Sequence, residues 1–172
     1  MKDEYFSLFE LEPSFNIDLA NLESNYRSLQ SASHPDRFVT ATNADKLASM
    51  HTATLANEAY LTLKNPANRA KYLLSLQGID AIKETNTHMP ADFLMQQMEW
   101  REAIDDAKSA NDVAALESLL NEMQQAAKAL QTQLVSLMDD KKDYVLATDV
   151  TRKLIFIDKV SADIDKIIEI LE

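Results

Sequence analysis

The sequence has no cysteine, and only one glycine and four prolines in 172 residues. The lack of cysteine excludes disulfides, thiolate metal sites and cysteine nucleophiles. The scarcity of glycine and proline leaves few of the turns that β-hairpins require, whereas good helix formers such as Ala, Leu, Glu and Gln are abundant. With 46% hydrophobic residues, the chain is long enough for one ordinary domain or two small ones. We therefore predict an all-α fold.

Acidic residues outnumber basic residues, and the excess differs between the two halves of the chain. The formal net charge is −11, with 7 basic and 9 acidic groups in residues 1–76 but 10 and 19 in residues 77–172. Nucleic acids and anionic membranes are bound through basic surfaces, so this balance argues against both as partners. The N-terminus "MKDEYFSLFE" has acidic residues where a signal peptide needs a basic region and an apolar run, and no stretch approaches a membrane span. We expect a cytoplasmic protein.

Proline and glycine divide the N-terminal half into helices. Asp18 suits an N-cap, and it precedes apolar residues that are spaced three and four apart, as on one helical face: Leu19, Leu22, Tyr26 and Leu29. This helix is predicted to end at Ser33, because the residue before a proline is pushed out of the α region. A second helix is predicted from about Asn43 to Leu63, and a short third helix starts at Pro66 and ends at Gly78.

The C-terminal half has the pattern of a helical bundle. Residues 77–90 contain Gly, Asn, Thr and Pro without helical periodicity, which indicates a linker. Pro90 then opens a block of three helices, joined by short polar turns near Asn111 and Lys141. The clearest apolar seam comprises Val113, Leu116, Leu120, Met123, Ala127, Leu130, Leu134 and Leu137. A further seam, interrupted at Lys153, comprises Leu146, Val150, Ile157, Val160, Ile164, Ile167 and Leu171. We predict an antiparallel three-helix bundle over residues 91–172.

Histidine, proline and aspartate stand together at His34, Pro35 and Asp36, between two predicted helices. A histidine beside a carboxylate can act as a base with its orienting partner. No nucleophile, glycine-rich loop or oxyanion-donor cluster accompanies the pair, and His51 and His88 lack metal-ligand spacing. The simplest alternative is a helix stop followed by a turn cap. Because proline fixes its own φ and restricts its predecessor, the tripeptide also presents an imidazole and a carboxylate in one stiff, exposed arrangement that suits recognition.

Four segments in residues 1 to about 76, namely "DEYFSLFEL", "YRSL", "HPDRF" and "NEAYLTLKNPANRAKYLL", resemble in their order the J-domain of DnaJ-type co-chaperones. The resemblance implies docking onto a DnaK-class ATPase chaperone and stimulation of its ATP hydrolysis, with His34, Pro35 and Asp36 as the critical loop. Arg27 is the only basic residue from Asp18 to Ser33, the segment that corresponds to the second helix of a J-domain, which typically has a basic exposed face. Electrostatic steering toward an acidic chaperone surface should therefore be weak, with Arg27, Arg37 and Lys46 as the residues that can contribute to it.

Two segments of the C-terminal half, "FLMQQMEWREAIDDA" and "RKLIFIDKV", resemble the C-terminal bundle of the HscB family, the specialised J-proteins of iron–sulfur cluster assembly. With the J-domain, this resemblance covers nearly the whole chain. It implies two partners, a dedicated chaperone of the HscA type and a cluster scaffold protein of the IscU type. It implies no cofactor, no resident metal and no enzymatic activity. An N-terminal cysteine-containing extension, found in eukaryotic relatives, is absent, which favours the bacterial type.

Helix geometry indicates a second surface in residues 91–108. At about 100° per residue, one face carries the residues of a core stripe: Phe93, Gln97, Trp100, Ile104 and Ala107. Leu94, Met95 and Met98 cluster with Glu102 on nearly the opposite side. They either pack against another part of the chain or are kept for a partner, and methionine suits adaptable binding surfaces. The family resemblance favours the scaffold protein, contacted by Leu94, Met95, Met98, Glu99, Arg101, Glu102 and Phe156.

Phe156 has two interpretations. It lies about 100° away from the seam that contains Val150 and Ile157, so the seam does not require it. It is either an interface aromatic or part of a broad core stripe shared with Leu154 and Ile155.

The predicted function is a J-type co-chaperone that brings an iron–sulfur scaffold protein to an ATPase chaperone. The alternative from another class is a helical adaptor that joins two proteins without affecting the rate of ATP hydrolysis. A di-metal helical enzyme is disfavoured, because the sequence has no Glu-x-x-His pair.

Overall fold

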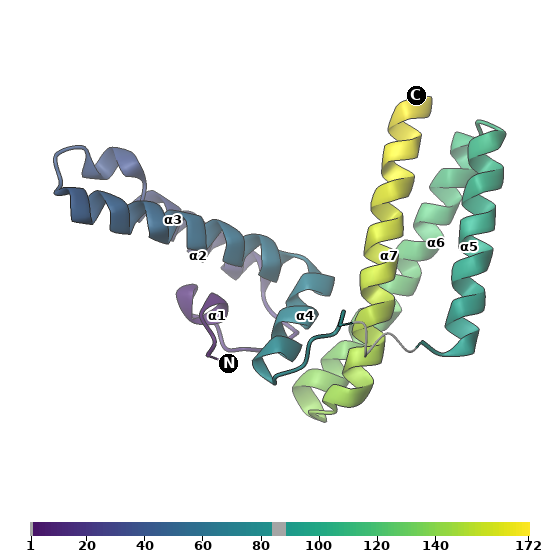
Figure 1. Cartoon of the computed structure of the whole chain (residues 1–172), viewed down its shortest axis with the longest axis horizontal. Coiled ribbons are helices and arrows are strands. Elements are labelled where there is room, and N and C mark those ends of the chain that lie inside the picture. The colour runs from purple at the N-terminus through teal and green to yellow at the C-terminus, as the bar shows by residue number, and fades with distance from the viewer. Residues whose placement is uncertain (1, 84–88) are drawn as a thin grey trace. The chain divides into compact units, whose positions relative to one another are not determined.

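The computed structural model describes residues 2–83 and 89–172, and every regular element within them is helical. The chain divides into two compact units, Met1–Ile79 and Asp80–Glu172. The first unit contains α1 (Tyr5–Leu8), α2 (Leu19–Ala32), the 3-10 helix η1 (Pro35–Phe38), α3 (Asn43–Lys64) and α4 (Pro66–Leu76). The second contains α5 (Ala91–Ser109), α6 (Val113–Leu134), the π-helical segment η3 (Val135–Asp140) and α7 (Tyr144–Leu171) (Figure 1). The predicted all-α class is confirmed.

The first unit is built on the antiparallel pair α2 and α3, which lie side by side (Figure 1). Asp18 caps α2 as predicted, because its side chain accepts a hydrogen bond from the backbone N–H of Asn21. Thr42 caps α3 in the same way, through the N–H of Asp45. Such caps each stabilise a helix by about 1 kcal/mol. The buried residues of the pair are small or aliphatic, which lets the helices approach closely: Leu22, Ser49, Ala56, Ala59 and Leu63.

The ends of α4 match the sequence signals. Pro66 occupies its first turn, where a missing N–H costs nothing, and the side chain of Asn65 accepts a hydrogen bond from the N–H of Asn68. After Leu76 the chain leaves the helix through Gly78, which has a φ of +77°. Glycine adopts this left-handed conformation without strain, so the predicted stop at Gly78 is confirmed.

Arg69 joins three segments of the first unit. Its side chain is buried, at 5% relative exposure. Nε donates to the carbonyl oxygen of Phe15 at 2.8 Å, and Nη1 donates to that of Leu63 at 2.7 Å. The guanidinium also lies 4.7 Å from the ring centroid of Phe15. Because the last carbonyls of a helix lack intrahelical partners, Arg69 completes the C-terminal end of α3 and ties it to α4 and to the segment before α2.

Tyr72 holds α1 against α4. Its hydroxyl donates to Oδ1 of Asp3 at 2.8 Å and accepts from the backbone N–H groups of Glu4 and Tyr5 at 3.1 and 3.2 Å. Its ring stacks on that of Tyr5, with centroids 4.6 Å apart. Burial raises the pKa of the Tyr72 phenol above the ordinary value of 10.0, and the hydrogen bond to Asp3 raises it further, against a lowering by the N–H of Tyr5.

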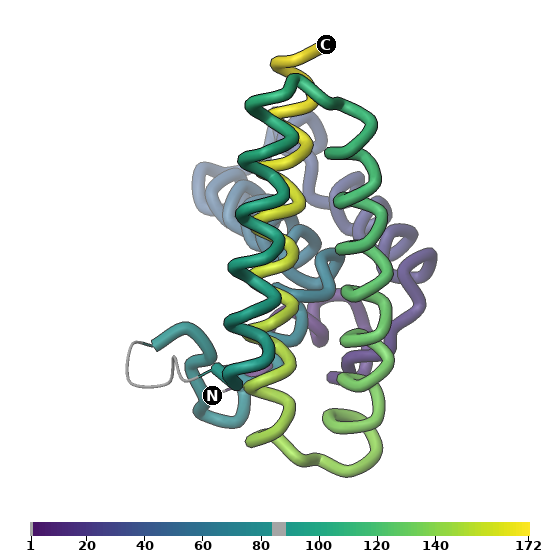
Figure 2. Tube along the Cα trace, turned by 90° about the vertical axis from the view of Figure 1, so that its right-hand side faces the viewer, coloured from purple at the N-terminus to yellow at the C-terminus, as the bar shows by residue number. Residues whose placement is uncertain are grey.

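The second unit is a three-helix bundle in which α6 and α7 make the most extensive contact, and Figure 2 shows α5 packed across the α6–α7 hairpin. The predicted turns are confirmed, since Asn111 and Lys142 have φ values of +52° and +54° on either side of α6 and η3. Eight of the fifteen predicted seam residues are buried: Leu116, Met123, Leu130 and Leu134 of α6 and Val150, Ile157, Val160 and Ile164 of α7.

Two features of the bundle differ from the prediction. The last turns before the α6–α7 connection are π-helical, over Val135–Asp140, rather than a simple continuation of α6. Leu146, assigned to the α7 seam, is 51% exposed. It lies near the start of α7, where the α6–α7 hairpin extends beyond the N-terminal end of α5 (Figure 2). The spacing of apolar residues in one helix does not report how far a neighbouring helix reaches.

The predicted linker, residues 77–90, lies partly outside the described residues, as do Glu84 and His88. In its described part, Ala81 is buried, and its carbonyl oxygen accepts a hydrogen bond from Nε of Arg152 at 2.8 Å. Part of this segment therefore packs against α7.

We expect Tyr72→Phe to destabilise the first unit by about 1 to 2 kcal/mol, because it removes three hydrogen bonds and keeps the stacked ring. A phenol with a raised pKa in the folded state contributes stability below its unfolded pKa and loses that contribution as the pH rises through the folded value. Wild-type stability should therefore fall above about pH 10, and the variant should lose less of it. Urea unfolding at pH 8 to 11 measures both; parallel losses in the two proteins would contradict the assignment.

Candidate functional site

Pro35 shapes the connection between α2 and α3. His34 is extended, with φ −61° and ψ 135°, as a residue before proline must be. Ser33 closes α2 just before it, because both its backbone N–H and its hydroxyl donate to the carbonyl oxygen of Leu29. Pro35 then opens η1, so the chain turns within a few residues and presents this loop at one end of the hairpin.

His34 and Asp36 are brought together at this tip. Nδ1 of His34 accepts a hydrogen bond from the backbone N–H of Asp36 at 3.2 Å, and it lies 3.5 Å from Oδ2 of the same residue. A ring nitrogen that accepts carries no proton, so the neutral imidazole in this geometry holds its proton on Nε2. The side chains are 55% and 89% exposed. The loop therefore offers a donor and a carboxylate to a partner.

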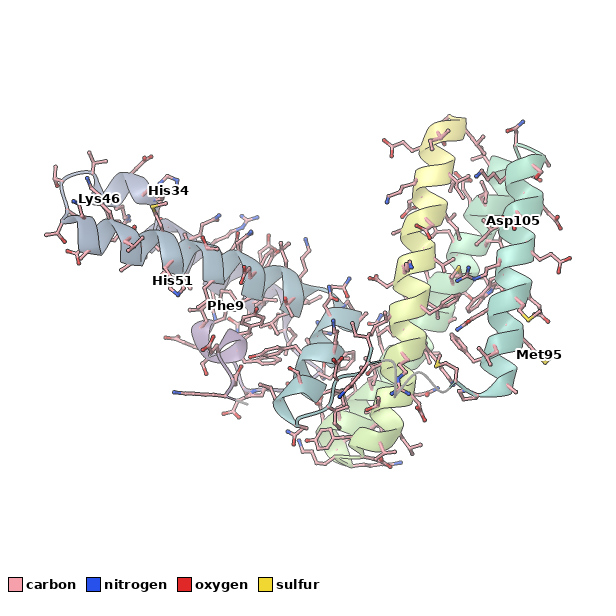
Figure 3. The ribbon with its side chains drawn as sticks, viewed as in Figure 1. Phe9, His34, Lys46, His51, Met95 and Asp105 are labelled. Atoms are coloured by element: carbon pink, nitrogen blue, oxygen red, sulfur yellow. The ribbon has the colours of Figure 1, made fainter. Side chains whose placement is uncertain are left out.

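The cations near the loop are few. Arg27, exposed on α2, places Nη2 at 2.7 Å from Oε1 of Glu23. Arg37 is exposed within η1, and Figure 3 shows Lys46 at the same end of the hairpin as His34. An exposed pair such as Arg27–Glu23 adds little stability, but it reduces the positive field that α2 presents.

The sequence analysis did not predict the exposed apolar side chains that lie beside the loop. Val39 follows η1, and Leu47 and Met50 lie in the first turns of α3; they are 68%, 70% and 57% exposed. The helix η1 packs against α3. The sequence did contain one signal for an exposed apolar residue here. At about 100° per residue, Leu47 lies on the face of α3 opposite to Ala56, which is buried.

The structure places the predicted α5 residues on the outer face of the bundle. Leu94, Met95 and Met98 are 46%, 63% and 70% exposed, and Figure 3 shows Met95 on the edge of α5 away from α6 and α7. Glu99 and Glu102 are exposed beside them. We call these five residues, Leu94, Met95, Met98, Glu99 and Glu102, the α5 patch. The core stripe is confirmed at four positions, Phe93, Trp100, Ile104 and Ala107, while Gln97 is half-buried.

Phe156 belongs to an aromatic cluster between α7 and α5. It is half-buried. Its ring is nearly parallel to that of Trp100, at 6.3 Å and 13°, and meets Phe93 edge-on at 5.8 Å. The guanidinium of Arg101 lies 5.5 Å from its centroid. The structure thus brings Arg101 and Phe156 together, and Phe156 has a packing role whether or not a partner also contacts it.

Within residues 2–83 and 89–172, no three His, Cys, Asp or Glu side chains form a group that could hold a metal ion. His51 projects from the opposite edge of α3 to His34 (Figure 3). None of the helices in this part of the chain is both long and apolar enough to cross a bilayer.

Because Phe156 packs on two rings, Phe156→Ala should lower the free energy of unfolding of the second unit by about 2 kcal/mol, below the 3 to 5 kcal/mol of a fully buried phenylalanine. Met95→Ala, at a mostly exposed position, should cost less than about 0.5 kcal/mol. Chemical denaturation of both variants measures the difference. Equal stability of the two would show that the cluster contributes nothing to the fold.

Comparisons with known proteins find relatives along the whole chain. A family model described as the HSCB C-terminal oligomerisation domain matches residues 89–165. A co-chaperone protein HscB homolog from Burkholderia thailandensis is 47% identical over 172 residues, which are 100% of this chain and 98% of the relative. The solved structure of chaperone HscB from Vibrio cholerae is 35% identical, with a TM-score of 0.84 over 99% of this chain and 100% of that one. Human co-chaperone protein HscB is 31% identical, with a TM-score of 0.86 over 95% and 81%.

The two solved structures share the helical fold of this chain over 100% and 81% of their lengths, the Burkholderia relative is similar in sequence over 98% of its length, and these relatives are co-chaperones rather than enzymes. The chain therefore belongs to the HscB family of co-chaperones.

Proposed function

We propose that this protein is a J-type co-chaperone of iron–sulfur cluster assembly that works in the cytoplasm. It delivers a scaffold protein of the IscU type to a DnaK-class chaperone of the HscA type and stimulates ATP hydrolysis by that chaperone. The exposed His34-Pro35-Asp36 loop at the tip of the α2–α3 hairpin, in a chain of the HscB family, is the observation that carries the proposal. Residues 1–76 are proposed as the J-domain, 77–90 as a linker and 91–172 as the client-binding bundle.

On the chaperone side, the loop acts by binding and contributes no reacting group. The N–H donor on Nε2 of His34 and the carboxylate of Asp36 are held in one stiff arrangement next to the exposed Arg37. Arg27 lies on α2, the helix that precedes the loop. A partner's reaction is accelerated by such a contact only if the loop binds the faster-hydrolysing state of the chaperone more tightly than the slower one. A preformed loop loses little conformational entropy on docking, which leaves more of the contact energy for that discrimination.

On the scaffold side, the α5 patch supplies apolar anchors with charged neighbours. Leu94, Met95 and Met98 are the anchors, since exposed apolar side chains grouped on one helix face gain by being covered. Glu99 and Glu102 favour a scaffold surface with basic groups at the matching positions. Arg101 and Phe156 complete the proposed contact where α7 meets α5.

The two sites lie in different units, so the connection between them gives the protein its function. A scaffold protein held by the second unit stays at a high effective concentration near a chaperone held by the first. At this effective concentration the scaffold protein binds the chaperone more readily than it would from solution. That contact between scaffold protein and chaperone accounts for an expected extra stimulation of ATP hydrolysis when the scaffold protein is present.

His34→Gln or Asp36→Asn should abolish stimulation of the chaperone's steady-state ATPase and leave the melting temperature within about 1 °C, because exposed substitutions rarely cost stability. His51→Gln makes the same chemical change on the exposed surface of α3 and serves as the matched control. A helical adaptor would bind without stimulating in every form of the protein. Undiminished stimulation by either loop variant refutes the assignment of the loop.

Combining Leu94→Ala, Met95→Ala and Met98→Ala should weaken binding of the scaffold protein, with each change costing on the order of 1 to 3 kcal/mol as interface anchors do. The triple variant should still stimulate the basal ATPase, because the loop is untouched, and should lose the extra stimulation that the scaffold brings. Ile170→Ala, at an apolar position of α7 that is 82% exposed, is the control. Titration calorimetry with the scaffold protein measures the affinity of each variant. If the triple variant binds as tightly as the wild type, the client-binding surface lies elsewhere.

A further inference from the structure

A groove opens where the α6–α7 hairpin continues beyond the start of α5. α5 has 19 residues and α7 has 28, a difference of about 13 Å at 1.5 Å per residue. Pro90, directly before α5, borders the groove, while Ser136 and Leu137 of η3 and Leu146 and Val150 of α7 line it. Its volume is about 430 Å³. We call it the hairpin groove.

The floor of the hairpin groove is bundle core that none of the helices in residues 2–83 and 89–172 covers. Leu137, Leu146 and Val150 continue the apolar seams of α6 and α7 toward the connection between them. Val150 is buried, but Leu146 is 51% exposed. Because each Å² of apolar surface removed from water gains about 25 cal/mol, an apolar segment that continues the line of α5 would be stabilised here.

The charges of the hairpin groove have the sign opposite to that of the unit around it. Residues 80–172 hold 10 basic and 19 acidic groups, yet Lys141 and Lys153 both line the groove. Among the described residues that line it, Asp149 alone is acidic, and its Oδ1 lies 3.3 Å from Nη1 of Arg152. The groove is therefore suited to a segment that combines apolar side chains with a carboxylate.

The hairpin groove is continuous with the proposed scaffold-binding surface through Lys153. Its Nζ lies 5.5 Å from the ring centroid of Phe93, in the first turn of α5. Phe93 meets Phe156 edge-on, and Leu94 of the α5 patch follows Phe93 in the chain. A partner that covers Leu94 and Phe156 thus already lies next to a residue of the groove.

We propose that the hairpin groove is a second contact for the scaffold protein, occupied by an apolar segment of that protein with at least one carboxylate. This inference rests on the proposed function, because it takes the scaffold protein as the occupant of the α5 patch. Glu99 and Glu102 then meet cations at one end of the contact, and Lys141 and Lys153 meet an anion at the other. Because the two ends of the contact carry opposite charges, the scaffold protein can bind in one orientation, and the reverse orientation is disfavoured by like-charge repulsion.

Neighbouring residues provide matched pairs for the test. Leu146 lines the groove, whereas Val145, 77% exposed, does not. Likewise Lys141 lines it and Lys142 does not. In titration calorimetry of the full chain with an IscU-type scaffold protein, Leu146→Ser and Lys141→Glu should each weaken binding about 5- to 30-fold. Val145→Ser and Lys142→Glu should change it less than about 2-fold, and added salt should shrink the effect of Lys141→Glu.

The outcomes separate this inference from the proposed function. If Met95→Ala weakens binding and the groove variants match their controls, the groove inference is overturned and the scaffold assignment of the α5 patch stands. If no variant of either surface weakens binding, both are overturned. Sedimentation of the protein alone supplies a third outcome: self-association that Leu146→Ser abolishes would make a second copy the occupant and overturn the inference. Lys141→Glu, an exposed change, keeps the test valid if Leu146→Ser loosens the hairpin.

Discussion

The backbone restriction that Pro35 places on His34 is the constraint on which the first unit and its proposed activity depend. If α2 ran on without a break, residues two positions apart would not face each other, and His34 and Asp36 would point in different directions. Because His34 is held extended, α2 stops, and Nδ1 of His34 reaches the N–H of Asp36. The same break lets the chain reverse into α3, which supplies a rigid support for the loop. One proline therefore creates both the hairpin and the group it presents.

A stiff loop can orient a partner only if the helices that carry it are also rigid, and the polar contacts of Arg69 and Tyr72 fix the end of the unit away from the loop. The guanidinium of Arg69 takes the place of water as the hydrogen-bond donor to two backbone carbonyls, and it lies over the ring of Phe15. Removing one partner from a buried, hydrogen-bonded charge is far costlier than removing an exposed ion pair such as Arg27–Glu23. Stability is thus concentrated in the part of the unit away from the loop, which leaves the residues of the tip free to be chosen for binding.

Local signals in the sequence were sufficient for most of the α-helices and insufficient for the contacts between them. The cap at Asp18, the start at Pro66 and the core stripe of α5 depend on neighbours in the chain, and each was predicted. The role of Arg69 depends on a carbonyl 54 residues away, and the exposure of Leu146 depends on where another helix begins. Phe156 shows the same limit, because the angle around α7 left core and interface open until the rings of α5 were placed beside it. Periodicity reports which face of a helix is apolar, but not what lies against it.

The two proposed surfaces differ in their physics in a way that suits two tasks. The loop is polar and held in one arrangement, so its binding energy changes steeply with the geometry of the partner; a contact that must distinguish two states of one chaperone needs that sensitivity. The α5 patch relies on methionine, whose flexible side chain accommodates small changes in the opposing surface at little cost. Its affinity should therefore survive modest rearrangement of the client. Charges at Glu99 and Glu102 then limit the orientation rather than the strength of the contact, since rim charges act mainly on encounter and register.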